Sequence, residues 1–338
     1  MKYPLDNKKV LYIAPRFFGY ENEIKNELER RGAKVDFLLD RPFESAFMKA
    51  VTRFRRDWVI GAANKYYRQS VSALNAAEYD FVFVISGQTL SAEVLEEWRS
   101  TFVNAKFVLY MWDSFANRQS ALDNLKFFDS VLSFDRTDAD KYGLRFRPLF
   151  FSSGFEQANT SSLDIDVSFI GTAHSDRYSV VSKVDRCLGH DVKKHWYLFL
   201  QAKWVYWAYL LINPTFRSAK IAHFKFESLA KQDVQAVFNS SKAILDVEHP
   251  HQTGLTMRTL ETLGARKKLI TTNSSVKTYD FYSEQNICVI DRLAPEIPNS
   301  FLHTEYKDVS PELYQKYRLE GWLDEILQAA EEDGIARK

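Results

Sequence analysis

The sequence predicts an α/β protein built from two doubly wound domains, each with a mostly parallel sheet covered by helices on both faces. Three observations lead to this class. Apolar strand-like runs alternate with helical segments through the first half of the 338-residue chain. A stretch rich in Ser, Gly, Asn and Thr at 150–164 then reads as a linker, and the alternation restarts at 165. A chain of this length also suits two cores better than one. We therefore expect two Rossmann-like domains facing a cleft.

The first half contains five strand-like runs that are almost continuously apolar, as in a sheet buried on both faces. These runs are 9–14, 34–39, 80–86, 106–112 and 130–134. Helical segments separate them at 21–32, from about 43 to 76, from Ser91 to about 101, near 118–126 and near 137–142. The first of these helices is expected to stop at Gly32.

The second half repeats this order with fewer strands. Strands are predicted at 165–171, 242–248, 268–273 and 286–291, and helices up to about 188, at 194–213, at 231–241 and around 257–264. The tail at 310–333 begins with Ser-Pro and is amphipathic, which indicates a helix. We expect an N-terminal domain at 1–155, a C-terminal domain at 156–309, and a helix at 310–338 that packs back on the first domain.

The composition excludes several classes of protein. The formal net charge is +1, so the chain lacks the basic field of a nucleic-acid binder. No run of 18 uncharged apolar residues occurs, and the first residues lack the apolar stretch of a signal peptide. Cys187 and Cys288 have no metal-ligand spacing and are expected to be reduced core residues of a cytoplasmic protein. The absence of GxGxxG, GxxxxGK[ST] and GxSxG motifs argues against dehydrogenase, P-loop and hydrolase chemistry.

Ligands of open α/β sheets bind beyond the carboxyl ends of the strands. The strand at 165–171 ends in "FIGTAHSDR", which brings Gly171, Thr172, His174 and Arg177 to such an end. Backbone N–H groups at a helix start favour phosphate, and an arginine can add a bidentate contact. A plain strand-to-helix turn with a solvated arginine explains the same residues.

A second candidate is "HPHQTGLTMRTLETLG" at 249–264. Arg258 and Glu261 share a helical face by their spacing of three residues. The carboxylate can accept hydrogen bonds from both hydroxyls of a ribose, and the guanidinium can hold a diphosphate. A local ion pair is the ordinary alternative. The preceding loop follows a predicted strand, which favours a ligand, and contributes Glu248, His249, His251, Thr253, Gly254 and Leu255.

These two motifs together resemble the C-terminal half of the GT-B glycosyltransferases, in particular the CgeB-like and lipopolysaccharide-core or capsule biosynthesis group. The resemblance covers about 165–291 and implies a nucleotide-diphospho-sugar donor in the second domain. By position, Glu261 would hold the ribose, Arg258 and Arg177 the diphosphate, and the Gly171–Thr172 turn would lie close by. The better-known pair of glutamates about eight residues apart is missing, since "HPHQTG" stands in place of the first and Glu248 is displaced.

The same resemblance implies that the first domain binds the acceptor and supplies the base. Asp113 follows a predicted strand, next to Trp112 and near Arg118, and a carboxylate there could deprotonate an acceptor hydroxyl. A helix cap or Asx turn is the alternative for Asp113.

The loop after the first strand supplies a second candidate base. Glu21 lies there beside Gly19 and Tyr20, in a loop that GT-B enzymes keep flexible. A first-turn residue that complements the helix dipole is the alternative for Glu21.

The resemblance therefore implies a hexosyltransferase-type glycosyltransferase that passes a sugar to a glycan or lipid-linked acceptor in bacterial lipopolysaccharide or capsule synthesis. No cofactor and no metal are expected, because arginine and helix-terminus charge would stabilise the leaving diphosphate. The DxD-like "DID" at 164–166 precedes a strand and therefore lies at the wrong edge of the sheet. Two alternatives stay open: a non-catalytic nucleotide- or sugar-binding subunit of an assembly complex, and a GT-B sugar epimerase.

Two aromatic and basic stretches, 47–68 and 193–211, also suggest peripheral contact with the cytoplasmic face of the inner membrane. Basic amphipathic helices with aromatic side chains lie on anionic lipid surfaces. Burial in the core, or a homodimer interface, explains the same aromatic residues.

Overall fold

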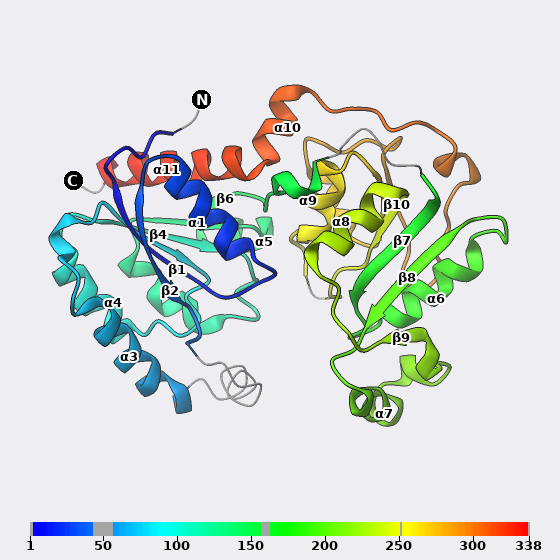
Figure 1. Cartoon of the computed structure of the whole chain (residues 1–338), viewed down its shortest axis with the longest axis horizontal. Coiled ribbons are helices and arrows are strands. Elements are labelled where there is room, and N and C mark those ends of the chain that lie inside the picture. Colours follow the sequence, from blue (N-terminus) through cyan, green and yellow to red (C-terminus); the bar gives the residue numbers. More distant parts are fainter. Residues whose placement is uncertain (1–2, 43–56, 157–162, 251, 337–338) are drawn as a thin grey trace. The chain divides into compact units, whose positions relative to one another are not determined.

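The computed structural model describes residues 3–42, 57–156, 163–250 and 252–336 (Figure 1). Its contacts divide the chain into two compact units. Unit 1 is Met1–Pro148 together with Leu319–Lys338, and unit 2 is Leu149–Arg318. Each unit contains one six-stranded sheet whose paired strands all run parallel. The predicted pair of doubly wound α/β domains is confirmed.

The sheet of unit 1 has the order β2-β1-β3-β4-β5-β6. Its strands are β1 (Lys9–Ala14), β2 (Lys34–Leu39), β3 (Phe81–Ile85), β4 (Lys106–Met111), β5 (Ser130–Ser133) and β6 (Arg145–Phe146). Its helices are α1 (Tyr20–Arg30), α3 (Asp57–Val71), α4 (Ala92–Thr101), α5 (Arg136–Tyr142) and α11 (Leu319–Ala336). Figure 1 shows α1 and α11 on one face of the sheet and α3 and α4 on the other. The central strands are buried on both faces, which explains their continuous apolar runs.

The C-terminal helix returns to unit 1, as expected from the sequence. Trp322 of α11 is fully buried, and its ring meets Tyr110 of β4 edge-on with the ring centroids 4.8 Å apart. The predicted single tail helix is nevertheless wrong, because α10 (Pro311–Tyr317) ends at Arg318, whose backbone is extended. Ser310 caps α10 by accepting from the Leu313 N–H group. The break at Arg318 leaves α10 in unit 2 and α11 in unit 1.

The sheet of unit 2 has the order β12-β11-β10-β7-β8-β9. Its strands are β7 (Ile165–Thr172), β8 (Lys194–Phe199), β9 (Phe224–Lys225), β10 (Ser241–Asp246), β11 (Lys268–Thr271) and β12 (Ile287–Val289). Its helices are α6 (Arg177–Cys187), α7 (Lys203–Ile212), α8 (Lys231–Ser240), α9 (Met257–Gly264) and α10. From β7 the chain passes to β8 and β9 toward one edge of the sheet. It then returns to β10, beside β7, and passes to β11 and β12 toward the other edge.

The single helix predicted at 194–213 is wrong in its first part. Lys194–Phe199 forms β8, which pairs along its whole length with β7, and only Lys203–Ile212 is helical. An unbroken aromatic run shows neither the two-residue period of a strand nor the 3.6-residue period of a helix. Its structure therefore depends on pairing with the neighbouring strand. The two-residue strands β6 and β9 were not predicted, because two residues are too few to show a period.

The linker predicted at 150–164 is partly wrong as well. Phe150 and Phe151 are fully buried, and Phe155 packs against Phe238 of α8. A Cβ atom added to Gly264 would lie 2.5 Å from the Phe151 ring, so this helix end requires glycine for close packing. Contacts therefore assign the first residues of this stretch to unit 2, and its residues 157–162 lie outside the described part.

The cysteines also differ from expectation. Cys187 is exposed at the end of α6 and Cys288 is half-buried, so neither is a core residue. Among the described residues, no helix combines the length and the apolar character needed to cross a bilayer.

Candidate functional site

The strand order of unit 2 creates a switch point between β7 and β10. These strands are hydrogen-bonded neighbours, but the chain leaves β7 toward β8 and leaves β10 toward β11. The loops at 173–176 and 247–256 therefore start side by side at the carboxyl edge and diverge. Ligands of open α/β sheets bind at such a point. The two sequence motifs, about 80 residues apart, meet at this edge as predicted.

Helix α9 is anchored to the end of β10 by hydroxyl groups. Asp246 is buried, and its Oδ2 accepts hydrogen bonds from Thr256 Oγ1 at 2.6 Å and Thr259 Oγ1 at 2.7 Å. Thr256 is also the N-cap, because its Oγ1 accepts from the Thr259 N–H group. The start of α9 is thus capped from within the protein.

Helix α6 begins differently. Its N-cap residue Asp176 makes no side-chain bond to the helix, because its carboxylate is bound to Arg292 instead. The first turn of α6 therefore lacks the side-chain cap that α9 has. Uncapped N–H groups at a helix start form a ready site for an anion such as phosphate.

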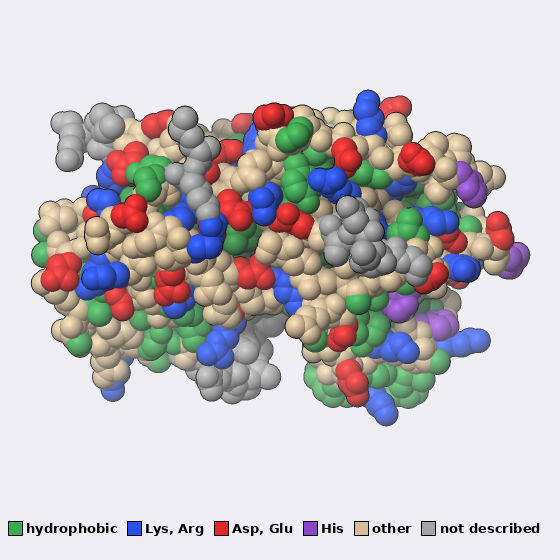
Figure 2. Space-filling view, turned by 45° about the horizontal axis from the view of Figure 1, so that its top comes forward, with side chains coloured by type: hydrophobic (Ala, Val, Ile, Leu, Met, Phe, Trp, Pro, Cys, Tyr) green, Lys and Arg blue, Asp and Glu red, His purple; other side chains and the backbone are tan. Residues whose placement is uncertain are grey.

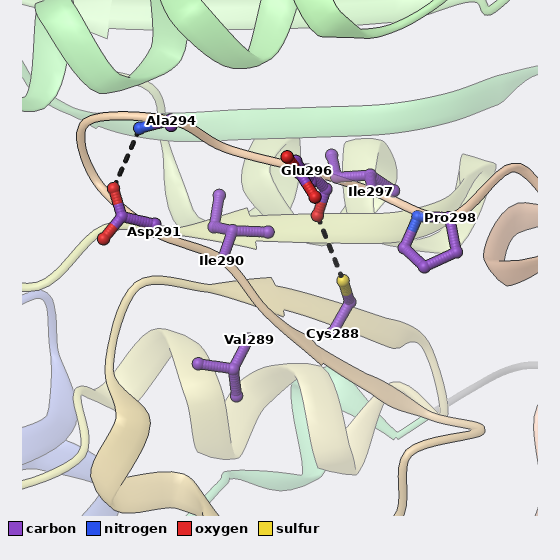
Figure 3. Close-up of a pocket in the computed structure, with 8 residues that line it drawn as sticks. All are labelled: Cys288, Val289, Ile290, Asp291, Ala294, Glu296, Ile297 and Pro298. Carbon is purple, nitrogen blue, oxygen red and sulfur yellow. Dashed lines mark hydrogen bonds between the residues drawn. The ribbon is translucent and has the colours of Figure 1, made fainter.

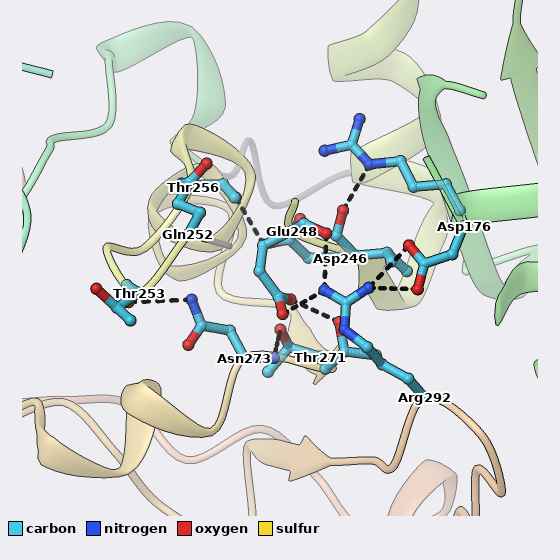
Figure 4. Close-up of polar contacts among 12 residues, drawn as sticks. Asp176, Asp246, Glu248, Gln252, Thr253, Thr256, Thr271, Asn273 and Arg292 are labelled. Atoms are coloured by element: carbon cyan, nitrogen blue, oxygen red, sulfur yellow. Dashed lines mark hydrogen bonds and ion pairs between the residues drawn. The ribbon is translucent and has the colours of Figure 1, made fainter. Parts of the chain in front are cut away.

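Arg292 is the centre of a polar network that sequence reasoning missed (Figure 4). Its Nη1 atom donates to both carboxylate oxygens of Asp176, at 3.0 and 2.9 Å, and its Nη2 atom donates to the carbonyl and side chain of Glu248. Glu248 also accepts from Thr272 Oγ1 at 2.5 Å. Burial by itself would lower the pKa of Arg292, but the two carboxylates raise it overall. Arg292 directly follows the predicted strand at 286–291, and this position was the available signal.

We expect Arg292→Met to lower the free energy of unfolding by about 2–4 kcal/mol, because the buried Glu248 carboxylate would lose its only cationic partner among the described residues. Urea denaturation measures the change. The double variant Arg292→Met/Glu248→Gln should recover part of the loss, since it removes the Glu248 charge that the single variant leaves buried and unpaired. Strict additivity of the two single changes would contradict this coupling.

Arg177 opens α6 and bridges the two strand ends. Its Nε atom donates to the Val247 carbonyl at 2.6 Å, and its Nη1 atom donates to the Thr172 carbonyl at 3.3 Å. Within the described chain it has no ion pair with a carboxylate. Burial lowers its pKa, and the nearby Arg258 and Arg292 lower it further, against the opposite effect of Asp246 and Glu248. The charge of Arg177 is therefore the least compensated one at this edge.

The structure joins Arg258 and Glu261 in the local ion pair that the sequence left open. Arg258 Nη1 donates to Glu261 Oε2 at 2.6 Å. The side chain of Glu261 is 6% exposed, that of Arg258 is 22% exposed, and the guanidinium of Arg258 lies over the Phe238 ring at 4.9 Å. Their predicted roles toward ribose and diphosphate stay predictions.

The remaining residues of the predicted donor site lie around the same edge. Gly171 and Thr172 are the last residues of β7 and not a turn, because β7 pairs with β8 through Thr172. The rings of His174 and His249 come within 6.0 Å of each other, one from each loop. His251 lies outside the described residues.

Asn273, another residue not predicted, holds the 247–256 loop by donating to the carbonyl groups of Thr253 and Gly254, each at 3.3 Å. Gln252 donates to the Gly254 carbonyl as well. Leu255 is 1% exposed, so its side chain belongs to the core. The loop therefore presents backbone and polar groups at the edge.

The carboxyl edge of the unit 1 sheet carries an aromatic cluster, Phe17, Phe18 and Trp112. Phe17 and Phe18 are 40% and 70% exposed, and the Phe17 ring lies 4.9 Å from Phe18 and 5.5 Å from Trp112, centroid to centroid. Gly19 has φ +81° and is the N-cap of α1, and Tyr20 is buried. Exposed aromatic faces beside a strand end can stack on a sugar ring or another apolar surface.

Both candidate bases are engaged in local bonds. Asp113 accepts from its neighbour Ser114 N–H and from Asn117 Nδ2, each at 3.0 Å, and pairs with Arg118 at 2.9 Å. Glu21 is 6% exposed, and its Oε2 accepts from the Phe17 N–H group at 3.0 Å, which closes its own loop. Asp113 keeps partial access to solvent, so its geometry suits a base better.

Asp40 is a buried carboxylate of unit 1 that the sequence did not reveal. It follows β2 and accepts from the N–H groups of Gln88 and Thr89 at 2.8 and 2.9 Å, which positions the loop after β3. Burial raises the pKa of Asp40 to about 6, although these bonds and the charges of Arg41 and Arg118 lower it.

The Asp40 contribution to stability is expected to depend on pH. The folded pKa near 6 exceeds the unfolded value of about 3.9, so the folded state binds the proton more tightly. Stability from this group is fully present below about pH 4 and is lost as the pH rises through 6, by about 3 kcal/mol. Urea denaturation from pH 4 to 7 measures the free energy of unfolding of the wild type and of Asp40→Asn. The difference between the two should change with pH by this amount. A flat difference would contradict the assignment, and Asp140→Asn, at an exposed position, is the control.

Unit 2 also has a hollow beside the loop that carries Arg292 (Figure 3). It is lined by β12 and the following loop, from Cys288 to Pro298. Two carboxylates line it, Asp291 and Glu296, and Asp291 accepts from the Leu293 and Ala294 N–H groups and so shapes its own turn. The hollow contains none of the predicted site residues, and the chemistry of the switch point makes that edge the better candidate.

The described residues contain no group of three or more His, Cys, Asp or Glu side chains placed to hold a metal ion. The "DID" motif lies at the start of β7, where Asp166 pairs with Lys242 at 2.6 Å and accepts from the Lys193 N–H group. This is the edge opposite the switch point, as expected.

Comparison with known proteins identifies the architecture. No protein-family model and no curated protein sequence matches the chain. Among solved structures, a glycosyltransferase from Rickettsia africae ESF-5 is 12% identical with a TM-score of 0.59, covering 97% of this chain and 98% of that one. Anabaena Alr3699/HepE in complex with UDP-glucose is 11% identical with a TM-score of 0.61, covering 96% and 99%. The chain has the GT-B fold.

A third GT-B structure supports this assignment. The α,α-trehalose-phosphate synthase (UDP-forming) from Burkholderia xenovorans, solved with glucose-6-phosphate, is 10% identical with a TM-score of 0.61 and covers 95% of this chain and 100% of its own. All three matches span both units. Sequence identities of 10–12% establish the fold and leave the activity to be argued from the site.

Proposed function

We propose that the protein is a glycosyltransferase that uses a nucleotide-diphospho-sugar donor. The observation that carries the proposal is Arg177, whose incompletely compensated charge lies at the switch point of unit 2 beside the uncapped start of α6. A diphosphate fits this combination of guanidinium and helix N-terminus. Glu261 would accept the ribose hydroxyls, and Arg258 would add charge to the diphosphate. HepE has been solved in complex with UDP-glucose and with UDP and glucose, which makes UDP the first nucleotide to test.

In the proposed reaction, the bond between the anomeric carbon and the diphosphate oxygen breaks and the nucleoside diphosphate leaves. The acceptor oxygen bonds to the anomeric carbon, and its proton passes to a base, for which Asp113 is the best candidate in unit 1. Arginine charge and the α6 N-terminus would stabilise the leaving diphosphate, so we expect transfer without a metal or cofactor. The same rate with and without EDTA is the expected measurement.

The biological setting is proposed from the sequence resemblance to the CgeB-like and lipopolysaccharide-core or capsule group. The acceptor would be a glycan or lipid-linked sugar of a bacterial surface polysaccharide, the transferred group a hexose, and the enzyme cytoplasmic with peripheral contact to the inner membrane. The exposed Phe17 and Phe18 rings, with the half-buried Trp112 ring beside Phe17, offer a stacking surface for such an acceptor.

A non-catalytic nucleotide- or sugar-binding protein is the second candidate. The observation that favours it is the engagement of both Glu21 and Asp113 in bonds within their own loops. Slow hydrolysis of the donor without acceptor would support catalysis, whereas tight binding with an intact donor after long incubation would support the binding protein.

Isothermal titration calorimetry with UDP, GDP, ADP and CMP tests the donor assignment. We expect one of the three diphosphates to bind with at least about tenfold preference over the other nucleotides, since each base meets a different set of hydrogen-bonding groups. No binding of any of the four would overturn the proposed function. Binding of the corresponding sugar donor, followed by release of free diphosphate, would extend it to catalysis.

A further inference from the structure

Helix α7 carries an apolar face that the rest of unit 2 leaves uncovered. Trp204, Trp207 and Leu211 are 71%, 58% and 88% exposed, and their spacing of three and four residues places them on one side of the helix. Ile212, its last residue, is 74% exposed. We call these four residues the α7 surface. Val205, on the other side, is buried.

The helix itself is firmly packed. Tyr206 is 5% exposed, and its hydroxyl group donates to the Ala219 carbonyl at 3.0 Å. The Tyr209 ring lies 4.9 Å from Phe216, which is fully buried. The α7 surface is therefore presented by an anchored element. Two exposed tryptophans beside two exposed aliphatic side chains are unusual unless a partner covers them.

The chain segment that carries this surface is basic. Residues 200–226 contain four Lys or Arg residues and no Asp or Glu, and all four are exposed: Lys203, Arg217, Lys220 and Lys225. The first acidic residue beyond them is Glu227. Figure 2 shows hydrophobic side chains gathered at the lower right, the region where Figure 1 labels α7, with Lys and Arg side chains and a few Asp or Glu side chains at their edge. An apolar face with a basic rim complements an anionic surface.

We propose that the α7 surface docks unit 2 on an anionic lipid bilayer. Trp204 and Trp207 would lie at headgroup level, Leu211 and Ile212 would enter the acyl boundary, and the basic residues would contact the headgroup phosphates. A symmetric contact between two copies of the chain would instead bring the same positive charges face to face, which favours the lipid. The proposal rests on α7 and its rim, independently of the donor site.

Vesicle co-sedimentation of the full chain tests this docking. We expect binding to vesicles of equimolar phosphatidylcholine and phosphatidylglycerol, and little binding to phosphatidylcholine alone. Trp204→Ser/Trp207→Ser should weaken binding to the anionic vesicles by roughly tenfold or more, because two amphipathic rings leave the interface. Arg217→Glu/Lys220→Glu should also weaken it, and added salt should weaken binding of the wild type.

Val103→Ser is the matched control, because Val103 is 67% exposed in unit 1 and should not affect vesicle binding. An unchanged thermal unfolding midpoint of the tryptophan variant would show that it folds. Wild-type protein that stays in the supernatant with anionic vesicles would overturn the proposal, as would full binding by the tryptophan variant. A wild-type dimer that the same variant converts to monomers in light scattering would assign the surface to a second copy of the chain and also overturn it.

Discussion

Arg177→Gln is expected to weaken binding of the preferred nucleoside diphosphate by roughly tenfold to a hundredfold, the effect of losing charge-assisted hydrogen bonds worth about 1.5–3 kcal/mol. Arg177 has no carboxylate partner within the described residues, so its charge is available to a ligand. Binding of the nucleoside alone should change little, because it lacks the phosphates. Calorimetry with the diphosphate and the nucleoside separates the two contributions.

Arg186→Gln provides the control for Arg177→Gln. Arg186 is an exposed arginine in the last turn of the same helix, α6, and its loss should leave diphosphate binding unchanged. Because Arg177 also bridges the ends of β7 and β10, urea denaturation of Arg177→Gln must accompany the titration. Equal losses for diphosphate and nucleoside would assign Arg177 a purely structural role.

Glu261→Gln is expected to reduce the affinity for the ribonucleoside diphosphate by roughly tenfold or more, since a carboxylate that accepts from two hydroxyls makes two charge-assisted bonds. The preference for the ribonucleotide over its 2′-deoxy analogue should shrink in the same variant. Competition calorimetry with both nucleotides measures this preference. Wild-type affinity in the variant would show that the ribose assignment is wrong.

Stability gives an independent measure of the same residue. Glu261 is 6% exposed and paired with Arg258, so its replacement should also lower the free energy of unfolding, by about 1–3 kcal/mol. Glu284→Gln, at an exposed position of unit 2, should change neither stability nor binding. Lost stability with unchanged binding would support the ion-pair interpretation of Arg258 and Glu261.

The fold was predictable because its strands are buried on both faces. The runs Val10–Ala14 and Phe81–Ile85 are apolar at every position, and this local pattern identifies a central parallel strand. The pattern failed at Lys194–Phe199, where aromatic residues continue from strand into helix without a change of period. The same limit applies to the tail helix, whose break at Arg318 has no glycine or proline to mark it.

The candidate site shows a similar division. The sequence predicted three site residues, Arg177, Arg258 and Glu261. Each follows a strand and opens or lines a helix, and these are short-range properties. Arg292, Asp246 and Asn273 were missed because their partners are distant in the chain or because their role is to hold a loop. A hydrophobic period reports whether a residue is buried, and it carries no information about which charged group it faces.

The local order of residues was thus sufficient for the two parallel sheets and for the two loops where a donor is expected to bind. Strand order, set by long-range packing, placed β7 beside β10 and so brought those loops to one edge. It also placed Arg292 beside Glu248 and left Arg177 without a carboxylate partner in the described chain, whereas Arg258 and Glu261 pair within one helix. Each ion pair neutralises one arginine, so the positive charge that remains available to a ligand depends on all these pairings together. Only the folded chain determines these pairings.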